Sequence, residues 1–190
     1  MNGYHIALFI HLLFVLLASA AAAVALFASL RLRAAANSAE ALLWLSAIRK
    51  VVPLFPVSVA GLLASGAYMS HQLGAWAAPW VDASLLGLGL IVALGSGVEG
   101  SRMRLLAREL ADSGLSPRSR RLLRDPVAWA AKMCTLTLVV AVVFIMTLKP
   151  ATGGCAVALV AAIVAGVLGA APICRSAPTD SPTNAPGAAI

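Results

Sequence analysis

Five long apolar runs constrain the fold of this 190-residue chain more than any other feature. A membrane-spanning helix needs ~20 predominantly apolar residues to cross ~30 Å of hydrocarbon, and each run is close to that length. Only helices and closed barrels satisfy every backbone group in lipid, and the runs lack the alternating polarity of barrel strands. The sequence therefore predicts an all-α integral membrane protein with a bundle of five transmembrane helices. The predicted helices are 6–30, 51–73, 81–98, 127–148 and 155–173.

The composition supports this class and a simple domain organisation. Hydrophobic residues make up 61% of the chain and charged residues 11%, whereas soluble domains are roughly one half apolar and one quarter charged. We expect one transmembrane domain over 1–174, with a four-helix core plus a fifth C-terminal helix, and a disordered Pro- and Ser-rich cytoplasmic tail over 175–190. The first run has no basic residue before it and is followed by Arg31 and Arg33, which favours an uncleaved helix over a signal peptide.

The distribution of positive charge predicts the orientation. Of the 14 basic residues, four lie between the first and second runs and seven lie between the third and fourth runs. Because basic loops stay on the cytoplasmic side, we expect the N-terminus outside and the C-terminus inside a bacterial inner membrane. These arginines lie within a few turns of the lipid bilayer, so we expect them to attract anionic headgroups and not nucleic acid.

The connecting segments carry recognisable helix starts. Asn37 followed three residues later by Glu40 is typical of a helix N-terminus. It predicts a short amphipathic helix over 38–50, which we expect to lie along the inner membrane interface. Asp125 and Pro126 likewise predict the capped start of the fourth transmembrane helix.

Two stripes of small residues recur at four-residue spacing. Such spacing lets membrane helices approach closely, either within one chain or between copies in a homo-oligomer. The stripes are Gly89, Ala93, Gly97 and Ser101, and Ala158, Ala162, Gly166 and Ala170.

The predicted topology places all three histidines in the outer half of the membrane. His11 lies about two turns inside the outer boundary, and His71 lies at the end of the second helix, near Met69. Ionisable residues inside a membrane are candidate functional residues because they are costly in lipid. His11 has a plainer alternative as a packing residue hydrogen-bonded to a neighbouring helix. The plainer alternative for His71 is a solvent-exposed loop residue, and His5 is expected to be an anchor at the membrane interface.

Other apparent motifs do not indicate an activity. Asp82, Glu99 and Lys132 lie near predicted helix ends, where the ordinary expectation is that charged side chains reach back to water. The glycines of 95–100 match a dinucleotide-binding pattern but follow no strand, so they do not indicate a nucleotide site. Whether the protein is an enzyme stays open, because no acid–base or nucleophilic set can be assembled from the sequence.

Four segments carry a family resemblance over 6–150: FIHLLFVL, SGAYM, WAAPWVDASLLGLGLI and MTLKP. The chain resembles small bacterial multi-pass proteins of unknown function, related to the copper-resistance D proteins and the small membrane protoporphyrinogen oxidases that bind haem. The resemblance implies that His11 is an axial haem ligand, and it matches Lys149-Pro150 at the end of the fourth helix. The lysine that those oxidases carry near the start of the third helix is replaced here by the segment containing Asp82, which puts oxidase activity in doubt.

Three hypotheses follow from these residues. The first is a membrane protein that binds haem b through His11 in a redox role, with Lys149 pairing with a haem propionate. The second is a copper-handling protein, because imidazole and thioether ligands suit copper. The third is a structural or lipid-interacting protein without a cofactor. The copper ligands of the second hypothesis are His11, His71, Met69 and Met146.

Overall fold

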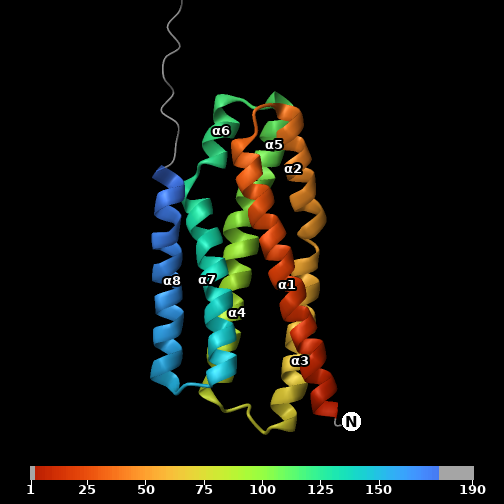
Figure 1. Cartoon of the computed structure of the whole chain (residues 1–190), viewed down its shortest axis with the longest axis vertical. Helices are drawn as coiled ribbons and strands as arrows, with labels where there is room; N and C mark the ends of the chain where they lie inside the picture. Colours follow the sequence, from red (N-terminus) through yellow and green to blue (C-terminus); the bar gives the residue numbers. More distant parts are fainter. Residues whose placement is uncertain (1–2, 176–190) are drawn as a thin grey trace, which may run out of the picture.

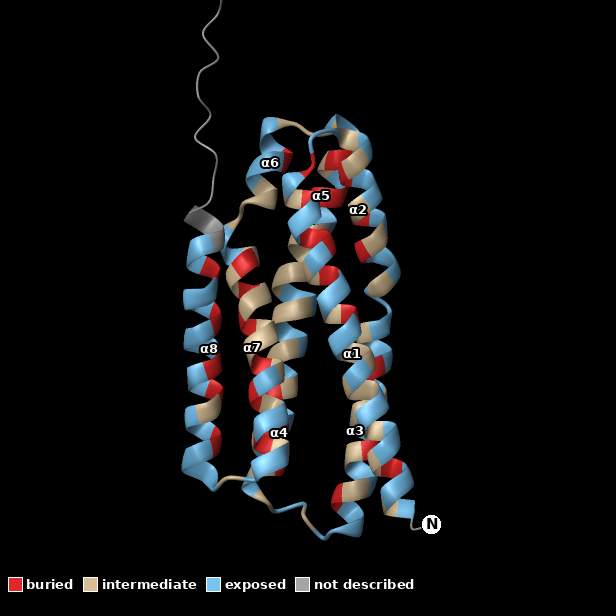
Figure 2. Ribbon diagram, viewed as in Figure 1, coloured by how far each residue is buried: buried red, intermediate tan, exposed pale blue. Residues whose placement is uncertain are grey.

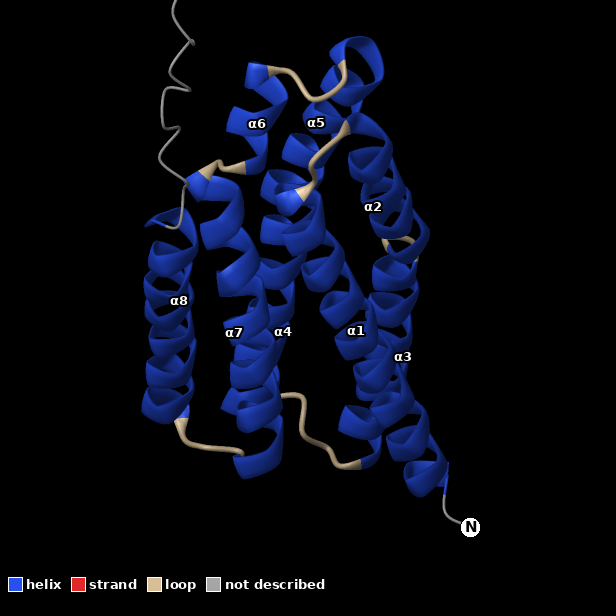
Figure 3. Ribbon diagram, turned by 45° about the horizontal axis from the view of Figure 1, so that its top comes forward, coloured by secondary structure: helices blue, strands red, loops and turns tan. Residues whose placement is uncertain are grey.

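The chain folds into a bundle of long, nearly parallel or antiparallel helices (Figure 1). The structure, a computed structural model, describes residues 3–175. Within that range it contains no strand, and apart from a short turn between α2 and α3 the loops lie at the two ends of the bundle (Figure 3). The helices are α1 Gly3–Ala34, α2 Ser38–Val51, α3 Leu54–Gln72, α4 Pro79–Val92, the π-helix η1 Ala93–Glu99, α5 Gly100–Ser113, α6 Pro117–Leu123, α7 Pro126–Leu148 and α8 Thr152–Arg175.

The prediction of five helices able to span a membrane is confirmed. Five helical stretches within residues 3–175 are long and apolar enough to cross a bilayer, and three of them combine shorter elements. One joins α2 and α3, another joins α4, η1 and α5, and the third joins α6 and α7. Large hydrophobic side chains such as Phe9, Leu16 and Val140 are exposed on the surface of the bundle, and exposed residues cover the outer faces of α1 and α8 (Figure 2). Such exposed apolar side chains are compatible with a multi-pass membrane protein. The expected tail lies, except for Arg175, outside the described residues.

The bundle has two chemically distinct ends (Figure 1). The arginine-rich end holds the α1–α2 turn, the end of α5, and α6. The histidine end holds the start of α1 and the loop between α3 and α4. The 32 residues of α1 make a helix about 48 Å long at 1.5 Å per residue. Because this exceeds the ~30 Å of hydrocarbon, one part of α1 must project beyond it, and Arg31 and Arg33 place that part at the arginine-rich end.

The expected position of the amphipathic helix over 38–50 is wrong. Its start is as predicted: the Asn37 side chain accepts a hydrogen bond from the Glu40 backbone N–H at 2.9 Å, and Glu40 accepts one from Ala36 at 3.0 Å. However, α2 stands almost in line with α3 and runs alongside α1 (Figure 1). A turn at Val52–Pro53 separates the two helices, since proline cannot donate the backbone hydrogen bond that would continue the ladder. The apolar stripe of α2 is therefore covered by protein.

The buried side chains form two separate cores. The first core, at the arginine-rich end, joins α1, α2 and α5, and the second joins α7 and α8 with α4 packed against them. The first core consists of Ala28, Leu32, Ala35, Ala41, Leu45, Ile48, Leu106, Ala107 and Leu110. The second core consists of Leu138, Ala141, Ile145, Cys155, Leu159 and Ala162.

The helix interfaces follow the same division. In the described chain the extended interfaces join α1 to α2 and α3, join α7 to α8, and join α4 and η1 to α7, with α4 also in contact with α8. We call α1, α2, α3 and α5 the first unit, and α4, α7 and α8 the second unit. Towards the histidine end, α1 and α3 separate from α4 and α7 (Figure 1). The two units are therefore joined mainly at the arginine-rich end.

Candidate functional site

His11 faces α3 and is held by a hydrogen bond between helices. Its Nδ1 lies 2.9 Å from Oγ of Ser65. The Ser65 hydroxyl donates to the Gly61 carbonyl at 2.6 Å, one turn earlier on α3. A Cβ atom added at Gly66 would lie 3.6 Å from Cε1 of the His11 ring, so the imidazole packs closely against the α3 backbone. The structure thus gives His11 the packing contacts of the plainer alternative, and these contacts also orient the ring.

This hydrogen-bond chain assigns the proton on the imidazole. A serine hydroxyl has one proton to donate, and the short hydrogen bond to the Gly61 carbonyl uses it. The Ser65 oxygen therefore accepts a hydrogen bond from the Nδ1–H of His11. The Leu62 carbonyl, 3.4 Å from the same hydroxyl, is a second acceptor beside the ring. Nδ1 therefore carries the hydrogen and Nε2 has the free lone pair. A histidine whose second nitrogen donates to a fixed partner is the usual arrangement of a metal-ligating imidazole.

The other predicted ligands on α3 differ in their positions. Met69 is half-buried and lies four residues after Ser65, so it is on the same face of α3, one turn nearer the histidine end. His71 is exposed and is six residues from Ser65, which places it on another face. The structure therefore groups Met69 with the His11 face of the α1–α3 pair and leaves His71 at the rim.

The two predicted residues near the end of α7 belong to the second unit. Met146 is half-buried on α7, which packs against α4, η1 and α8. Lys149 ends α7 in a left-handed conformation with φ of 49°, and its ammonium lies 5.0 Å from the centroid of the Trp80 ring. No hydrogen bond within residues 3–175 joins these residues to His11, and that range contains no group of three or more His, Cys, Asp or Glu residues able to hold a metal.

A second polar cluster lies towards the arginine-rich end, between η1 and α7. Nζ of Lys132 lies 2.6 Å from Oε2 of Glu99, and Oγ1 of Thr135 lies 3.3 Å from Oε1 of the same carboxylate. The two charged side chains are only 16% and 19% exposed. This pairing differs from the expectation that the Glu99 and Lys132 side chains reach back to water at helix ends. The sequence does place a carboxylate and an ammonium at similar depth on two neighbouring helices, which could have indicated an ion pair. The two residues are 33 positions apart, so the sequence alone does not show that they are in contact.

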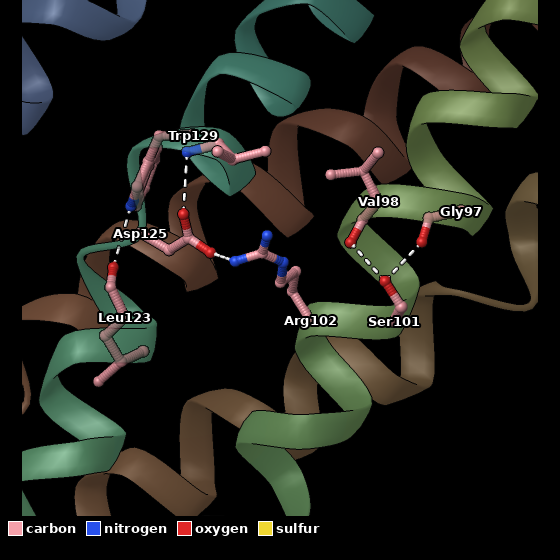
Figure 4. Close-up of polar contacts among 8 residues, drawn as sticks. Gly97, Val98, Ser101, Arg102, Leu123, Asp125 and Trp129 are labelled. Carbon is pink, nitrogen blue, oxygen red and sulfur yellow. Dashed lines mark hydrogen bonds and ion pairs between the residues drawn. The ribbon is translucent and has the colours of Figure 1, made fainter.

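An ion pair between Arg102 and Asp125 extends this cluster to the start of α7 (Figure 4). The predicted cap is confirmed, since the Asp125 carboxylate also accepts from the Val127 N–H at 2.9 Å. The Trp129 indole N–H donates to the Leu123 carbonyl at 3.0 Å, and the Arg33 guanidinium lies 5.6 Å from the Trp129 ring centroid. These contacts connect α1, α5, α6 and α7.

A small cleft of about 60 Å³ lies among these side chains. Its polar lining comes from Ser29, Glu99, Arg102, Trp129 and Lys132, and apolar side chains complete it. A space of this size holds on the order of a few water molecules. Because its cations and anions already pair with one another, the cleft presents no uncompensated charge to a ligand.

A second pocket, of about 380 Å³, opens at the histidine end, with Tyr4, His5, Tyr68 and Gln72 in its lining. The His5 ring packs edge-on against Tyr4, with centroids 5.8 Å apart. Gln72 donates to the Tyr68 hydroxyl at 3.1 Å. This aromatic and amide surface fits the predicted interfacial anchoring of His5.

Comparison of the chain with protein-family models, with curated proteins and with solved structures finds no match.

Proposed function

We propose that the protein is a multi-pass bacterial inner-membrane protein that binds haem b through Nε2 of His11 and serves a redox role. The observation that carries the proposal is the His11–Ser65–Gly61 hydrogen-bond chain. It fixes the ring orientation and leaves the nitrogen of an axial ligand free, as haem proteins with a histidine ligand require. The position of His11 inside a long apolar helix supports a low-dielectric environment for the group.

Lys149 is the proposed partner of a haem propionate. It lies at the end of α7 on the histidine end, and its ammonium stacks on Trp80 without a carboxylate partner within residues 3–175. Its attachment to the second unit means that a group bound at His11 and paired with Lys149 would join the two units. Haem bound there would supply one-electron chemistry.

The first experiment is a reduced-minus-oxidised spectrum of the protein purified in detergent after expression with a haem supply. We expect Soret and α bands that are absent in His11→Ala. We expect Ser65→Ala to keep the bands but to lower haem affinity by about 10- to 100-fold, the usual effect of losing the group that orients a ligating histidine. His71→Ala is the matched control and should keep the wild-type spectrum. A wild-type protein without these bands contradicts haem binding.

A copper-handling function is the second candidate, favoured by the position of Met69 on the His11-facing side of α3. In this case Nε2 of His11 and the thioether of Met69 would hold copper. His71 and Met146, which lie on another face of α3 and on α7, would join them only after a rearrangement. Titration of the same protein with Cu(I) distinguishes the two, because copper binding would be weakened in Met69→Ala and His71→Ala. If neither haem nor copper binds, the cofactor-free structural or lipid-interacting function is supported.

A further inference from the structure

The π-helix η1 lies where the chain crosses from one packing unit to the other. Before it, α4 packs against the second core, with Leu90 and Ile91 in contact. After it, α5 contributes Leu106, Ala107 and Leu110 to the first core. Since the extended interfaces otherwise stay within each unit, a change in the conformation of η1 would alter how the two units are oriented.

The geometry of η1 suits a bend. A π-helix is a widened turn, and short π segments within α-helices occur frequently at functional sites. The backbone N–H of Gly100 reaches the carbonyl of Gly95, five residues earlier. Ser96 donates to Val92 at 2.6 Å, and Ser101 donates to Gly97 and Val98 at 2.5 and 3.0 Å (Figure 4). Serine hydroxyls can satisfy the carbonyls of an irregular helix inside a membrane, so the widened turn loses few hydrogen bonds.

Two ion pairs attach this segment to α7. Glu99, the last residue of η1, pairs with Lys132, and Arg102 in the first turn of α5 pairs with Asp125. The Glu99–Lys132 pair is largely buried, and removing one partner of a buried pair leaves an uncompensated charge. The pair therefore favours one position of η1 relative to α7.

We propose that η1 is a hinge between the two units and that the Glu99–Lys132 ion pair is its latch. When the latch is closed, η1 is held against α7 and the units keep the separation described above. When it opens, the α1–α3 pair swings relative to α4, α7 and α8, with the largest displacement at the histidine end. The hinge needs no cofactor at His11, but a group that joined His11 to Lys149, as proposed above, would limit its opening, so the distances are measured on the cofactor-free protein.

Distance measurements between spin labels test the hinge in lipid nanodiscs. Spin labels attached to an introduced azido amino acid leave the native cysteines unmodified. One pair, Leu12 on α1 and Leu86 on α4, spans the two units, and a second pair, Leu86 and Val160 on α8, lies within the second unit. All three side chains are exposed. In Lys132→Met we expect the distance between units to shift or broaden by about 5 Å, as a bend of about 10° over a ~30 Å helix would produce. The distance within the second unit should stay unchanged.

Three variants separate the hinge from general loss of structure. Lys132→Arg keeps the positive charge and should retain the wild-type distances, as should the exchanged pair Glu99→Lys/Lys132→Glu. Lys50→Met removes an exposed lysine of α2 and should have no effect. Gly95→Ala/Gly97→Ala stiffens the segment without a clash, since a Cβ atom at either position meets nothing within 4 Å, and it should narrow the distribution between units. An unchanged distance between units in Lys132→Met, or an equal change within the second unit, overturns the proposal.

Discussion

Individual side chains determine how closely the helices approach, and Gly166 is the clearest case. A Cβ atom at this position would lie 2.5 Å from Cα and 2.6 Å from the backbone nitrogen of Cys134 on α7. Thr137 on α7 donates to the Ala162 carbonyl on α8 at 2.7 Å, one turn away from the same contact. The stripe of small residues that contains Gly166 is therefore used within the chain, against α7. The other stripe is different, because Gly89 and Gly97 have no neighbour within 4 Å of a Cβ position.

We expect Gly166→Ala to destabilise the protein by about 1–3 kcal/mol, the usual cost of overpacking, since the obstructing atoms are backbone and cannot rotate away. Gly169→Ala is the matched control on the same helix. A Cβ atom there meets nothing within 4 Å, so we expect no loss of stability. Unfolding in mixed micelles with increasing SDS, followed by circular dichroism, measures both. Equal stability of the two variants would show that α7 and α8 are not in this close contact.

The sequence allowed some of the site residues to be predicted but not others. His11 is conspicuous because an ionisable side chain is surrounded by apolar neighbours along the chain. Ser65 gave no such signal, because serine is common in membrane helices and its role depends on which helix faces it. Glu99 and Lys132 were each recognised as charged residues near helix ends, but their pairing depends on how η1 and α7 pack.

At the level of elements, Asp125 shows how one residue both begins a helix and attaches it to a neighbour. One carboxylate oxygen accepts from the Val127 N–H, and the other pairs with Arg102 on α5. The start of α7 could be predicted from sequence because caps are local and Pro126 fixes the first turn. The position of α2 could not be predicted. An amphipathic pattern shows that the apolar face is buried, but it does not show whether lipid or another helix buries it. The π geometry of η1 was also hidden, since glycine and serine are compatible with several helix types.

We expect Asp125→Asn to be less destabilising than Asp125→Ala. The asparagine oxygen can still cap α7 while the ion pair is lost, and loss of the cap itself costs about 1 kcal/mol. Arg102→Met should have an effect similar to Asp125→Asn, and the double variant should cost less than the sum of the two single variants. SDS unfolding of these four variants and of the unmodified protein gives the comparison, with Asp125→Asn/Arg102→Met as the double variant. Strict additivity would contradict an energetic contribution from the Arg102–Asp125 pair.

At the level of the whole molecule, the charge distribution and the topology agree. The basic segments of both connections lie at one end of the bundle, and the start of α1 and the loop containing Trp76 lie at the other (Figure 1). Five spans with loops alternating between the two ends follow directly from run length and are the part of the fold that sequence predicts best. The division into two units depends on side-chain packing and could not be predicted from hydropathy.

We expect the arginine-rich end to face the cytoplasm, following the positive-inside rule. A cysteine introduced by Ala77→Cys should react with a membrane-impermeant maleimide in intact cells, whereas one introduced by Arg120→Cys should react only after the cells are opened. Of the three native cysteines, Cys134 and Cys155 are buried, and the unmodified protein gives the background reaction of all three, Cys174 included. Reaction of both introduced cysteines from the same side would contradict this orientation.

The uninterrupted course of α1 has a mechanical consequence. His11 and Ser29 are 18 residues apart, which is five full turns and about 27 Å of helix, so they lie on one face of a single rod that contains neither proline nor glycine between them. One of these residues touches α3 and the other borders the cleft beside Trp129. Because α1 has no flexible point between these two residues, an axial shift or rotation of the helix at one end is transmitted to the other end.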